Sequence, residues 1–92
     1  MMPRLRATSQ FRKDLKRLVG DLDLLLKVTG VMSLVVAGEP LPPELKPHKL
    51  EGEYRDCWEC HMRPDLLLVW LPGTRAGLVT FVRIGSHAEL FG

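Results

Sequence analysis

Three histidines, an arginine and an aspartate give this 92-residue chain the means for acid–base chemistry on a phosphate ester. His48, His61 and His87 are the only histidines of the sequence, and all flank apolar runs rather than interrupting them. Asp65 opens one such run, and Arg83 lies near the end of the next. Histidine can accept or donate a proton near neutral pH, whereas arginine presents a permanent forked cation. We expect folding to bring these five side chains together.

Metal-free cleavage of RNA needs three groups at one phosphate. A base takes the proton of the ribose 2′-hydroxyl, an acid protonates the leaving 5′-oxygen, and a cation stabilises the crowded phosphate. Histidines can fill the first two roles, and Arg83 can fill the third. The residue types are therefore sufficient for a ribonuclease, although a lone histidine is more often an ordinary surface or core residue.

Cys57, Cys60 and His61 form the pattern Cys-x-x-Cys-His, which is typical of covalent haem attachment. A zinc site would take its ligands from this cluster together with His48 or His87. However, residues three apart on a strand point to opposite faces, so the two cysteines should diverge. Haem attachment also takes place outside the cytoplasm, and no export signal is visible. We expect no cofactor and no metal, with one cysteine in the core and the other a passive thiol.

Length and composition describe one small domain spanning residues 1–92. The hydrophobic share of 46% and the charged share of 26% are ordinary for a soluble globular protein. No apolar run approaches the roughly 20 residues that span a bilayer. Arg4 and Arg6 interrupt the N-terminal segment, where a signal peptide would be apolar. We expect a cytoplasmic protein without membrane association, in which both cysteines stay reduced.

Basic residues are concentrated at the N-terminal end of the chain. Residues 1–20 hold six of the 13 basic residues but only one of the 11 acidic ones. Four of them are expected on one side of a helix, and these are Arg12, Lys13, Lys16 and Arg17. Such a basic face suits a polyanion such as nucleic acid. The alternative is an ordinary solvated helix face.

Residues 4–7 are predicted to form a short first strand. Thr8 or Ser9 can then cap a helix by accepting a hydrogen bond from an early backbone amide. Gly20 is expected to end this helix, because glycine adopts the left-handed cap conformation without strain.

A second helix is predicted to begin after Asp21 or Asp23 and to continue to about Ala37. Its leucines and valines repeat at helical spacing. Residues 41–47 contain three prolines, so we expect a stiff connector there that delivers His48 to a fixed place.

The hydrophobic period changes from helical to strand-like in the second half of the chain. Strands are predicted at residues 53–60, 65–71 and 77–84, with turns at 63–64 and 72–74. Two hairpins in series form an antiparallel meander. The sequence therefore predicts an α+β fold, in which two N-terminal helices pack on one face of a small antiparallel sheet.

Three stretches resemble the YafQ family of toxins, within the RelE/ParE superfamily of toxin–antitoxin systems. They are residues 48–52 (HKLEG), 60–65 (CHMRPD) and 83–92 (RIGSHAELFG). Residues 11–14 (FRKD) and 41–42 (LP) match the family's first helix and connector. The resemblance implies a RelE-like fold and a ribosome-dependent endoribonuclease that cuts mRNA in the decoding site. It also implies a cognate antitoxin that holds the toxin inactive and alone connects it to operator DNA.

The resemblance places the family's active site on six positions, which are His48, His61, Asp65, Arg83, His87 and Phe91. It implies that the histidines and Asp65 share proton transfer around the scissile phosphate. Arg83 then holds that phosphate, and Phe91 packs against a base. One departure from the pattern is Glu59, which stands where some members have aspartate.

A binding role without catalysis is the alternative. ParE-like relatives share the fold but bind DNA gyrase and lack the histidine set, and a small non-catalytic binding module is also possible. The histidines matter to an enzyme and not to a binder, so their replacement separates these functions.

Overall fold

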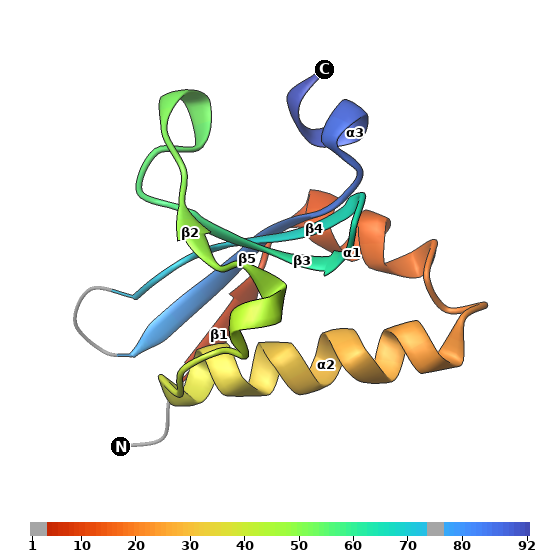
Figure 1. Cartoon of the computed structure of the whole chain (residues 1–92), viewed down its shortest axis with the longest axis horizontal. Coiled ribbons are helices and arrows are strands. Elements are labelled where there is room, and N and C mark those ends of the chain that lie inside the picture. The colour runs from red at the N-terminus through yellow and green to blue at the C-terminus, as the bar shows by residue number, and fades with distance from the viewer. Residues whose placement is uncertain (1–3, 74–76) are drawn as a thin grey trace.

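The computed structural model describes residues 4–73 and 77–92 (Figure 1). The strands are β1 (Arg4–Ala7), β2 (His48–Lys49), β3 (Trp58–Arg63), β4 (Leu66–Leu71) and β5 (Leu78–Gly85). The helices are α1 (Ser9–Lys16), α2 (Leu22–Ala37) and the short α3 (His87–Phe91), with single 3₁₀ turns η1 (Pro43–Leu45) and η2 (Gly52–Tyr54). The predicted α+β class is confirmed.

One five-stranded sheet organises the chain, in the order β1-β5-β4-β3-β2. The predicted meander of β3, β4 and β5 is confirmed, and β2 adds to it antiparallel to β3. The sheet is mixed rather than purely antiparallel, because β1 pairs parallel with β5. No hairpin joins β1 to β5, since both helices and three strands intervene, so nothing imposes an antiparallel pairing on them.

Both predicted N-terminal helices form. Thr8 caps α1 by accepting from the Phe11 amide, and Asp21 caps α2 by accepting from the Leu24 amide. Gly38, at φ 72°, ends α2 in the left-handed conformation. The first helix is shorter than predicted. It ends at Lys16 rather than at Gly20. The backbone hydrogen bonds that follow, such as that from the Leu18 amide to the Leu15 carbonyl, join residues three apart and form turns in place of an α-helix.

The strand predicted at residues 53–60 is wrong in its first half. Gly52 and Asp56 both have positive φ, at 72° and 73°, which is incompatible with extended backbone. The chain therefore forms η2 and a turn before β3 begins at Trp58. The other two strands appear within one residue of their predicted bounds. Part of the turn predicted at 72–74, Thr74, lies outside the described residues.

The C-terminal residues form the short helix α3, which was not among the elements predicted from the sequence. Ser86 accepts from the Glu89 amide, and the Glu89 side chain accepts from the Ser86 amide. This capping box starts α3 at His87. His87 is consequently held at a helix N-terminus rather than in a free turn.

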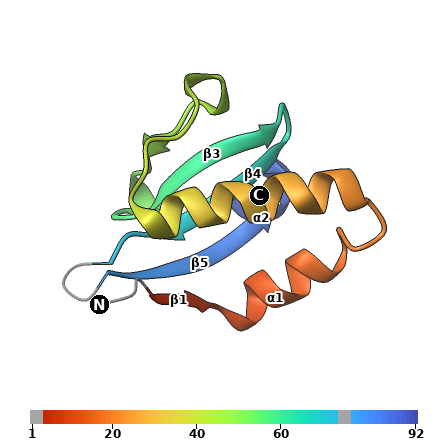
Figure 2. The same ribbon diagram turned by 90° about the horizontal axis from the view of Figure 1, so that it is seen from below.

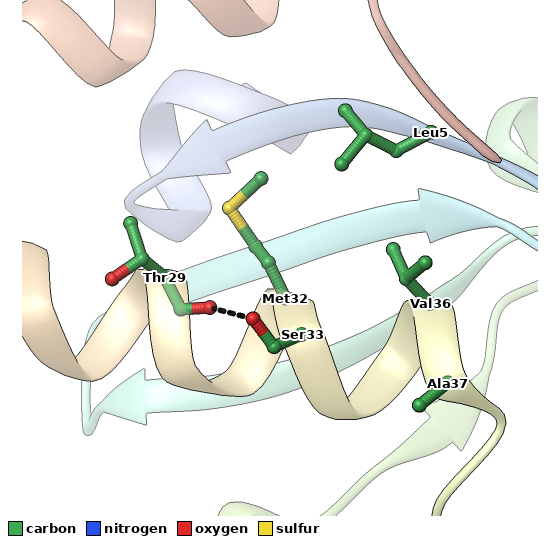
Figure 3. A pocket seen from close by; sticks show the side chains of 6 residues that line it. All are labelled: Leu5, Thr29, Met32, Ser33, Val36 and Ala37. Carbon is green, nitrogen blue, oxygen red and sulfur yellow. Dashed lines mark hydrogen bonds between the residues drawn. The ribbon is translucent and has the colours of Figure 1, made fainter. Parts of the chain in front are cut away.

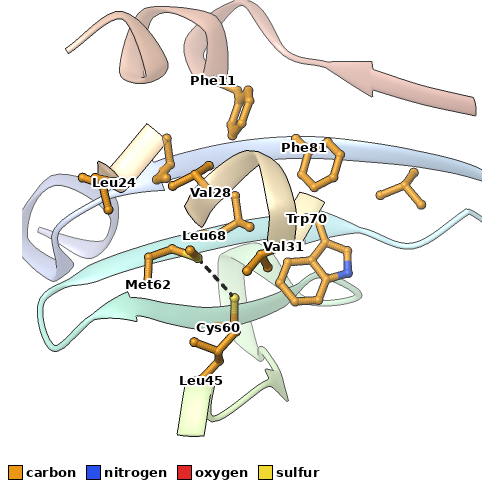
Figure 4. Packing of buried hydrophobic residues seen from close by; sticks show 12 residues of the cluster. Phe11, Leu24, Val28, Val31, Leu45, Cys60, Met62, Leu68, Trp70 and Phe81 are labelled. Atoms are coloured by element: carbon orange, nitrogen blue, oxygen red, sulfur yellow. Dashed lines mark hydrogen bonds between the residues drawn. The ribbon is translucent and has the colours of Figure 1, made fainter. Parts of the chain in front are cut away.

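The main core lies between the sheet and the helices α1 and α2, with α2 crossing the sheet as Figure 2 shows. Phe11 of α1 packs against Phe81 of β5, with ring centroids 5.7 Å apart, and Val28 of α2 joins the same cluster (Figure 4). A second buried cluster contains Leu67, Val69, Leu90 and Cys57, and it lies under α3 and η2. None of the helices in residues 4–73 and 77–92 is long and apolar enough to cross a bilayer.

Candidate active site

The histidines gather on the sheet face that α2 leaves uncovered. Along β3, Cys60 and Met62 point into the main core, so the alternation of the strand turns Glu59 and His61 to the other face. His48 of β2 lies directly opposite Glu59. The ring centroid of His61 is 6.2 Å from that of His48 and 6.0 Å from that of His87. Folding therefore brings the three histidines together, as predicted.

His87 forms a pair with Asp65. One carboxylate oxygen of Asp65 accepts from the His87 backbone amide at 3.1 Å and lies 3.0 Å from ring Nδ1. These bonds lower the pKa of Asp65 below its ordinary value. Because the carboxylate accepts a hydrogen from Nδ1, it fixes the tautomer and leaves Nε2 free for a substrate. Both side chains are more than half exposed, so a ligand from solvent can reach them.

His48 has hydrogen-bond partners at both ring nitrogens. Nδ1 lies 2.9 Å from the Lys46 carbonyl oxygen, and Nε2 lies 2.8 Å from the Glu59 carboxylate. A carbonyl oxygen can only accept a hydrogen bond, so Nδ1 of His48 carries a hydrogen. The contact between Nε2 and the Glu59 carboxylate needs a second hydrogen, which is bonded either to Nε2 or to Glu59. The second carboxylate oxygen of Glu59, Oε1, is buried without a partner among the described residues.

Two aromatic rings continue the row of histidines. The ring centroid of Phe91 lies 6.2 Å from that of His87. Phe91 also packs edge to face against Tyr54, with ring centroids 5.5 Å apart. Phe91 is 46% exposed, and it can pack against a base as the family resemblance implies. Tyr54 was missed by sequence reasoning. Its position depends on the 3₁₀ turn that replaced the predicted strand.

Arg83 was predicted to join the histidines, but in the structure its guanidinium is hydrogen-bonded to Asp14. Its Nε and Nη2 donate to the buried carboxylate of Asp14 at 2.8 and 3.2 Å, and no hydrogen bond to a histidine is formed in the described part of the chain. Hydrogen bonds to Asp14 raise the pKa of Arg83, with a smaller contribution from Tyr54. The Arg83 side chain is 19% exposed, and its Nη1 forms no hydrogen bond with Asp14.

Asp14 was also missed, although it is the only acid within a basic segment. Burial would raise its pKa, but the bonds from Arg83, the Ile84 amide and Gln10 together lower it. The carboxylate is therefore charged and fully committed to holding β5 against α1.

The basic residues of α1 are all exposed, as expected for a nucleic-acid contact. Arg17, which caps the C-terminal end of α1, forms an ion pair with Glu89 of α3. No ion pair joins Arg12, Lys13 or Lys16 to a carboxylate within the described ranges. The Arg17–Glu89 ion pair places the end of the basic face beside the helix that carries His87 and Phe91.

The two cysteines diverge as predicted, since Cys60 lies in the main core and Cys57 in the second cluster. Both are buried, so Cys57 as well as Cys60 is packed among apolar side chains. Burial raises the pKa of Cys60 to about 12 and also raises that of Cys57, which disfavours the thiolate that metals bind.

Within residues 4–73 and 77–92, the donor set that could hold a metal ion is His48, Glu59 and His61. Their ligand atoms lie within 4.8 Å of one another. Sequence reasoning did not include Glu59 in a zinc site. The signal was available in principle, because residues two apart on a strand share a face.

Comparison with known proteins assigns the chain to a family. The family model described as a bacterial toxin of type II toxin–antitoxin system, YafQ, matches residues 3–92. The mRNA interferase toxin YafQ of Escherichia coli K12 is 31% identical over 86 residues, covering 92% of this chain and 91% of that protein. A metal-bound toxin from Helicobacter pylori is 43% identical with a TM-score of 0.81, covering 98% of this chain and 100% of that chain. A chain of the E. coli DinJ–YafQ toxin–antitoxin complex is 30% identical with a TM-score of 0.82, covering 100% of both. The chain therefore belongs to the YafQ family of bacterial toxins of type II toxin–antitoxin systems, whose curated relatives are named mRNA interferases, a class of endoribonuclease.

Proposed function

We propose that the chain is a ribosome-dependent endoribonuclease that cleaves mRNA in the decoding site, without a metal ion. A cognate antitoxin holds it inactive, and the chain reaches operator DNA only through that antitoxin. It acts in the cytoplasm, where its ribosome and mRNA partners are found. The observation that carries the proposal is the Asp65–His87 pair, with the His61 ring 6.0 Å from His87 on an open face.

His61 and His87 are the rings best able to exchange protons with RNA. Nε2 of His87 faces away from Asp65, and the His61 ring forms no hydrogen bond within the described residues. One ring takes the proton from the ribose 2′-hydroxyl while the new 2′-oxygen–phosphorus bond forms. The other gives a proton to the 5′-oxygen as the phosphorus–oxygen bond to it breaks. The products are a 2′,3′-cyclic phosphate and a free 5′-hydroxyl.

The remaining groups stabilise and orient the reacting RNA. Arg83 binds the phosphate, and Phe91 packs against a base. The His48–Glu59 pair holds a further proton near His61, since the ring centroids of His48 and His61 are 6.2 Å apart. Since one group is enough for each transfer, loss of His48 should reduce the rate only in part.

The experiment is cleavage of a defined mRNA on programmed ribosomes in the presence and absence of EDTA. We expect equal cleavage in both, a 2′,3′-cyclic phosphate at the new end, and no cleavage of the same mRNA without ribosomes. The variant with all three histidines changed to alanine should be inactive but folded. Full cleavage by that variant, or dependence on a divalent metal, would refute the mechanism, and gyrase inhibition by the triple variant would favour a ParE-like binder.

A further inference from the structure

Tyr54 is mounted on a closed loop beside the row of histidines. The loop runs from Leu50 to Cys57, and the Leu50 amide closes it by donating to the Cys57 carbonyl at 2.9 Å. Within the loop, the Cys57 amide donates to the Tyr54 carbonyl at 3.0 Å and fixes the backbone at the end of η2. The Tyr54 side chain is half-buried and packs against the second core cluster. Both the backbone and the side chain of Tyr54 are therefore anchored.

The Tyr54 ring contacts Phe91, which belongs to a different element of the fold. The two rings pack edge to face, with an angle of 89° between their planes. Aromatic pairs favour this geometry, and it should favour the observed orientation of the Phe91 ring about 2- to 10-fold. A second aromatic neighbour of Phe91, His87, lies on the same short helix α3. Because Phe91 is 46% exposed, the contact with Tyr54 restrains a ring that solvent would otherwise leave free to reorient.

The hydroxyl end of Tyr54 lies toward Arg83. Hydrogen bonding to Asp14 raises the pKa of Arg83 most strongly, and hydrogen bonding to Tyr54 raises it further. The phenolic oxygen is the acceptor in this interaction, because a guanidinium has only donors. One side chain therefore reaches both the ring that packs against a base and the cation that binds the phosphate in the proposed function.

A larger apolar groove of the chain lies too far from the histidines to hold the same base. The groove has a volume of about 390 Å³ and lies between Leu5 of β1 and the side chains of Met32 and Val36 of α2 (Figure 3). It is on the face of the sheet that α2 covers, whereas the histidines lie on the other face. A base next to the scissile phosphate meets Phe91 and Tyr54 instead.

We propose that Tyr54 is a positioning residue for RNA cleavage, which holds the Phe91 ring in place for a base and steadies Arg83 at the phosphate. The inference deepens the proposed function and rests on it. A base and the neighbouring phosphate are covalently linked, so a fixed relation between their two binding groups reduces the entropy that is lost on binding. Through Phe91, the Tyr54 ring acts on substrate binding. Through Arg83, its hydroxyl acts on stabilisation of the crowded phosphate in the transition state.

The test measures kcat and KM for cleavage of a defined mRNA, with the mRNA-programmed ribosome as the varied substrate. Tyr54→Phe keeps the ring and removes the hydroxyl, so it should lower kcat about 2- to 10-fold and leave KM within about 2-fold of the parent. Tyr54→Leu removes both, so it should show the same loss of kcat and also raise KM about 2- to 10-fold. Equal KM values in the two variants would overturn the role of the ring, and a parental kcat in Tyr54→Phe would overturn that of the hydroxyl.

A double-mutant cycle separates positioning from a general effect on folding. If the ring acts through Phe91, Tyr54→Leu should raise KM less than about 2-fold in a Phe91→Leu background. Leu50→Ala is the matched control, because Leu50 packs against the same core cluster. It should lower the free energy of unfolding in urea, as Tyr54→Leu does, but leave KM within about 2-fold of the parent. A full rise in KM in the Phe91→Leu background, or an equal rise in Leu50→Ala, would overturn the inference.

NMR relaxation of the aromatic ring carbons tests the same contact without any cleavage. The chain has three phenylalanines, and Phe11 and Phe81 pack together in the main core, where they serve as internal references. Tyr54→Leu should lower the order parameter of the Phe91 ring, whereas Tyr54→Phe should leave it at the parental value. A Phe91 ring that is equally ordered in the parent and in Tyr54→Leu would overturn the inference. Loosening of this ring in a chain that cleaves no mRNA would refute the nuclease and leave the positioning of Phe91 by Tyr54 standing.

Discussion

Asp14 of α1 holds Arg83 of β5 through two hydrogen bonds, from Nε at 2.8 Å and from Nη2 at 3.2 Å. The same carboxylate accepts from the Ile84 amide at 3.1 Å. Asp14 is 2% exposed, so this is a nearly buried ion pair between residues 69 positions apart. This geometry fixes the orientation of the Arg83 guanidinium.

Asp14→Asn should destabilise the fold by about 3 kcal/mol, because a buried ion pair loses one partner and leaves Arg83 without its counter-ion. Urea denaturation measures this. The control is Asp23→Asn, an exposed acid in the first turn of α2, which should cost less than about 1 kcal/mol. Similar losses in both variants would mean that the Asp14 ion pair contributes little.

The pH dependence of stability should carry the same signature. The folded pKa of Asp14 is lowered, so its contribution is fully present above the carboxyl pKa of the unfolded chain. It is lost as the pH falls through the lowered folded value. The parent should therefore lose stability on acidification more steeply than Asp14→Asn. Parallel curves for the two proteins, measured by urea denaturation at several pH values, would contradict this account.

Much of the fold follows from local signals in the sequence. Thr8 and Asp21 cap the starts of α1 and α2, and Gly38 ends α2, each through contacts with neighbouring residues. Both helices were predicted to begin near Thr8 and Asp21. The start of α3 was also available locally, since Ser86 and Glu89 have the spacing of a capping box. The parallel pairing of β1 with β5 was not, because it depends on contacts between opposite ends of the chain.

The candidate site likewise contains residues that could be predicted from the sequence and residues that could not. The convergence of His48, His61 and His87 was expected from their positions at strand ends. Asp65, which holds His87, was in the predicted set, whereas Glu59 was not, because it acquires its role only through the register that sets it opposite His48. Tyr54 was missed for a related reason, since two positive-φ residues convert its predicted strand into a turn.

The basic face of α1 should contact ribosomal RNA. Changing Arg12, Lys13, Lys16 and Arg17 to glutamine should weaken ribosome binding, and the salt dependence should flatten by about 0.7 to 0.9 in slope for each phosphate that is no longer neutralised. Among single variants, Arg17→Gln should have a smaller effect than Lys16→Gln, because Glu89 already neutralises Arg17. Unchanged ribosome binding across salt would identify the face as ordinary solvated surface.

Asp65→Asn should lower mRNA cleavage about 10-fold, well below the roughly 10⁴-fold loss for a buried carboxylate in a serine protease triad, because Asp65 is exposed. The amide can no longer hold Nδ1–H of His87 as strongly. The folded pKa of Asp65 is lowered, so the pair is intact above the ordinary carboxyl range and is lost as the pH falls through the lowered value. Protonation of the histidine base slows both proteins on acidification, so the parent should lose rate more steeply than Asp65→Asn in that acidic range. A single-turnover pH profile on programmed ribosomes distinguishes these outcomes.

His87→Ala should reduce mRNA cleavage on programmed ribosomes about 10²–10⁴-fold, because an acid or base at the phosphate supplies a rate factor of that size. His48→Ala should cost less, since both nitrogens of that ring are already bonded to Lys46 and Glu59. The His87 side chain is 55% exposed and is not part of either core cluster, so urea denaturation should find its stability within about 0.5 kcal/mol of the parent. Antitoxin binding provides a second check that the variant is folded. A His87→Ala protein that is folded and cleaves at the parent rate would remove His87 from the mechanism, and a larger loss in His48→Ala would move proton transfer to the other end of the histidine row.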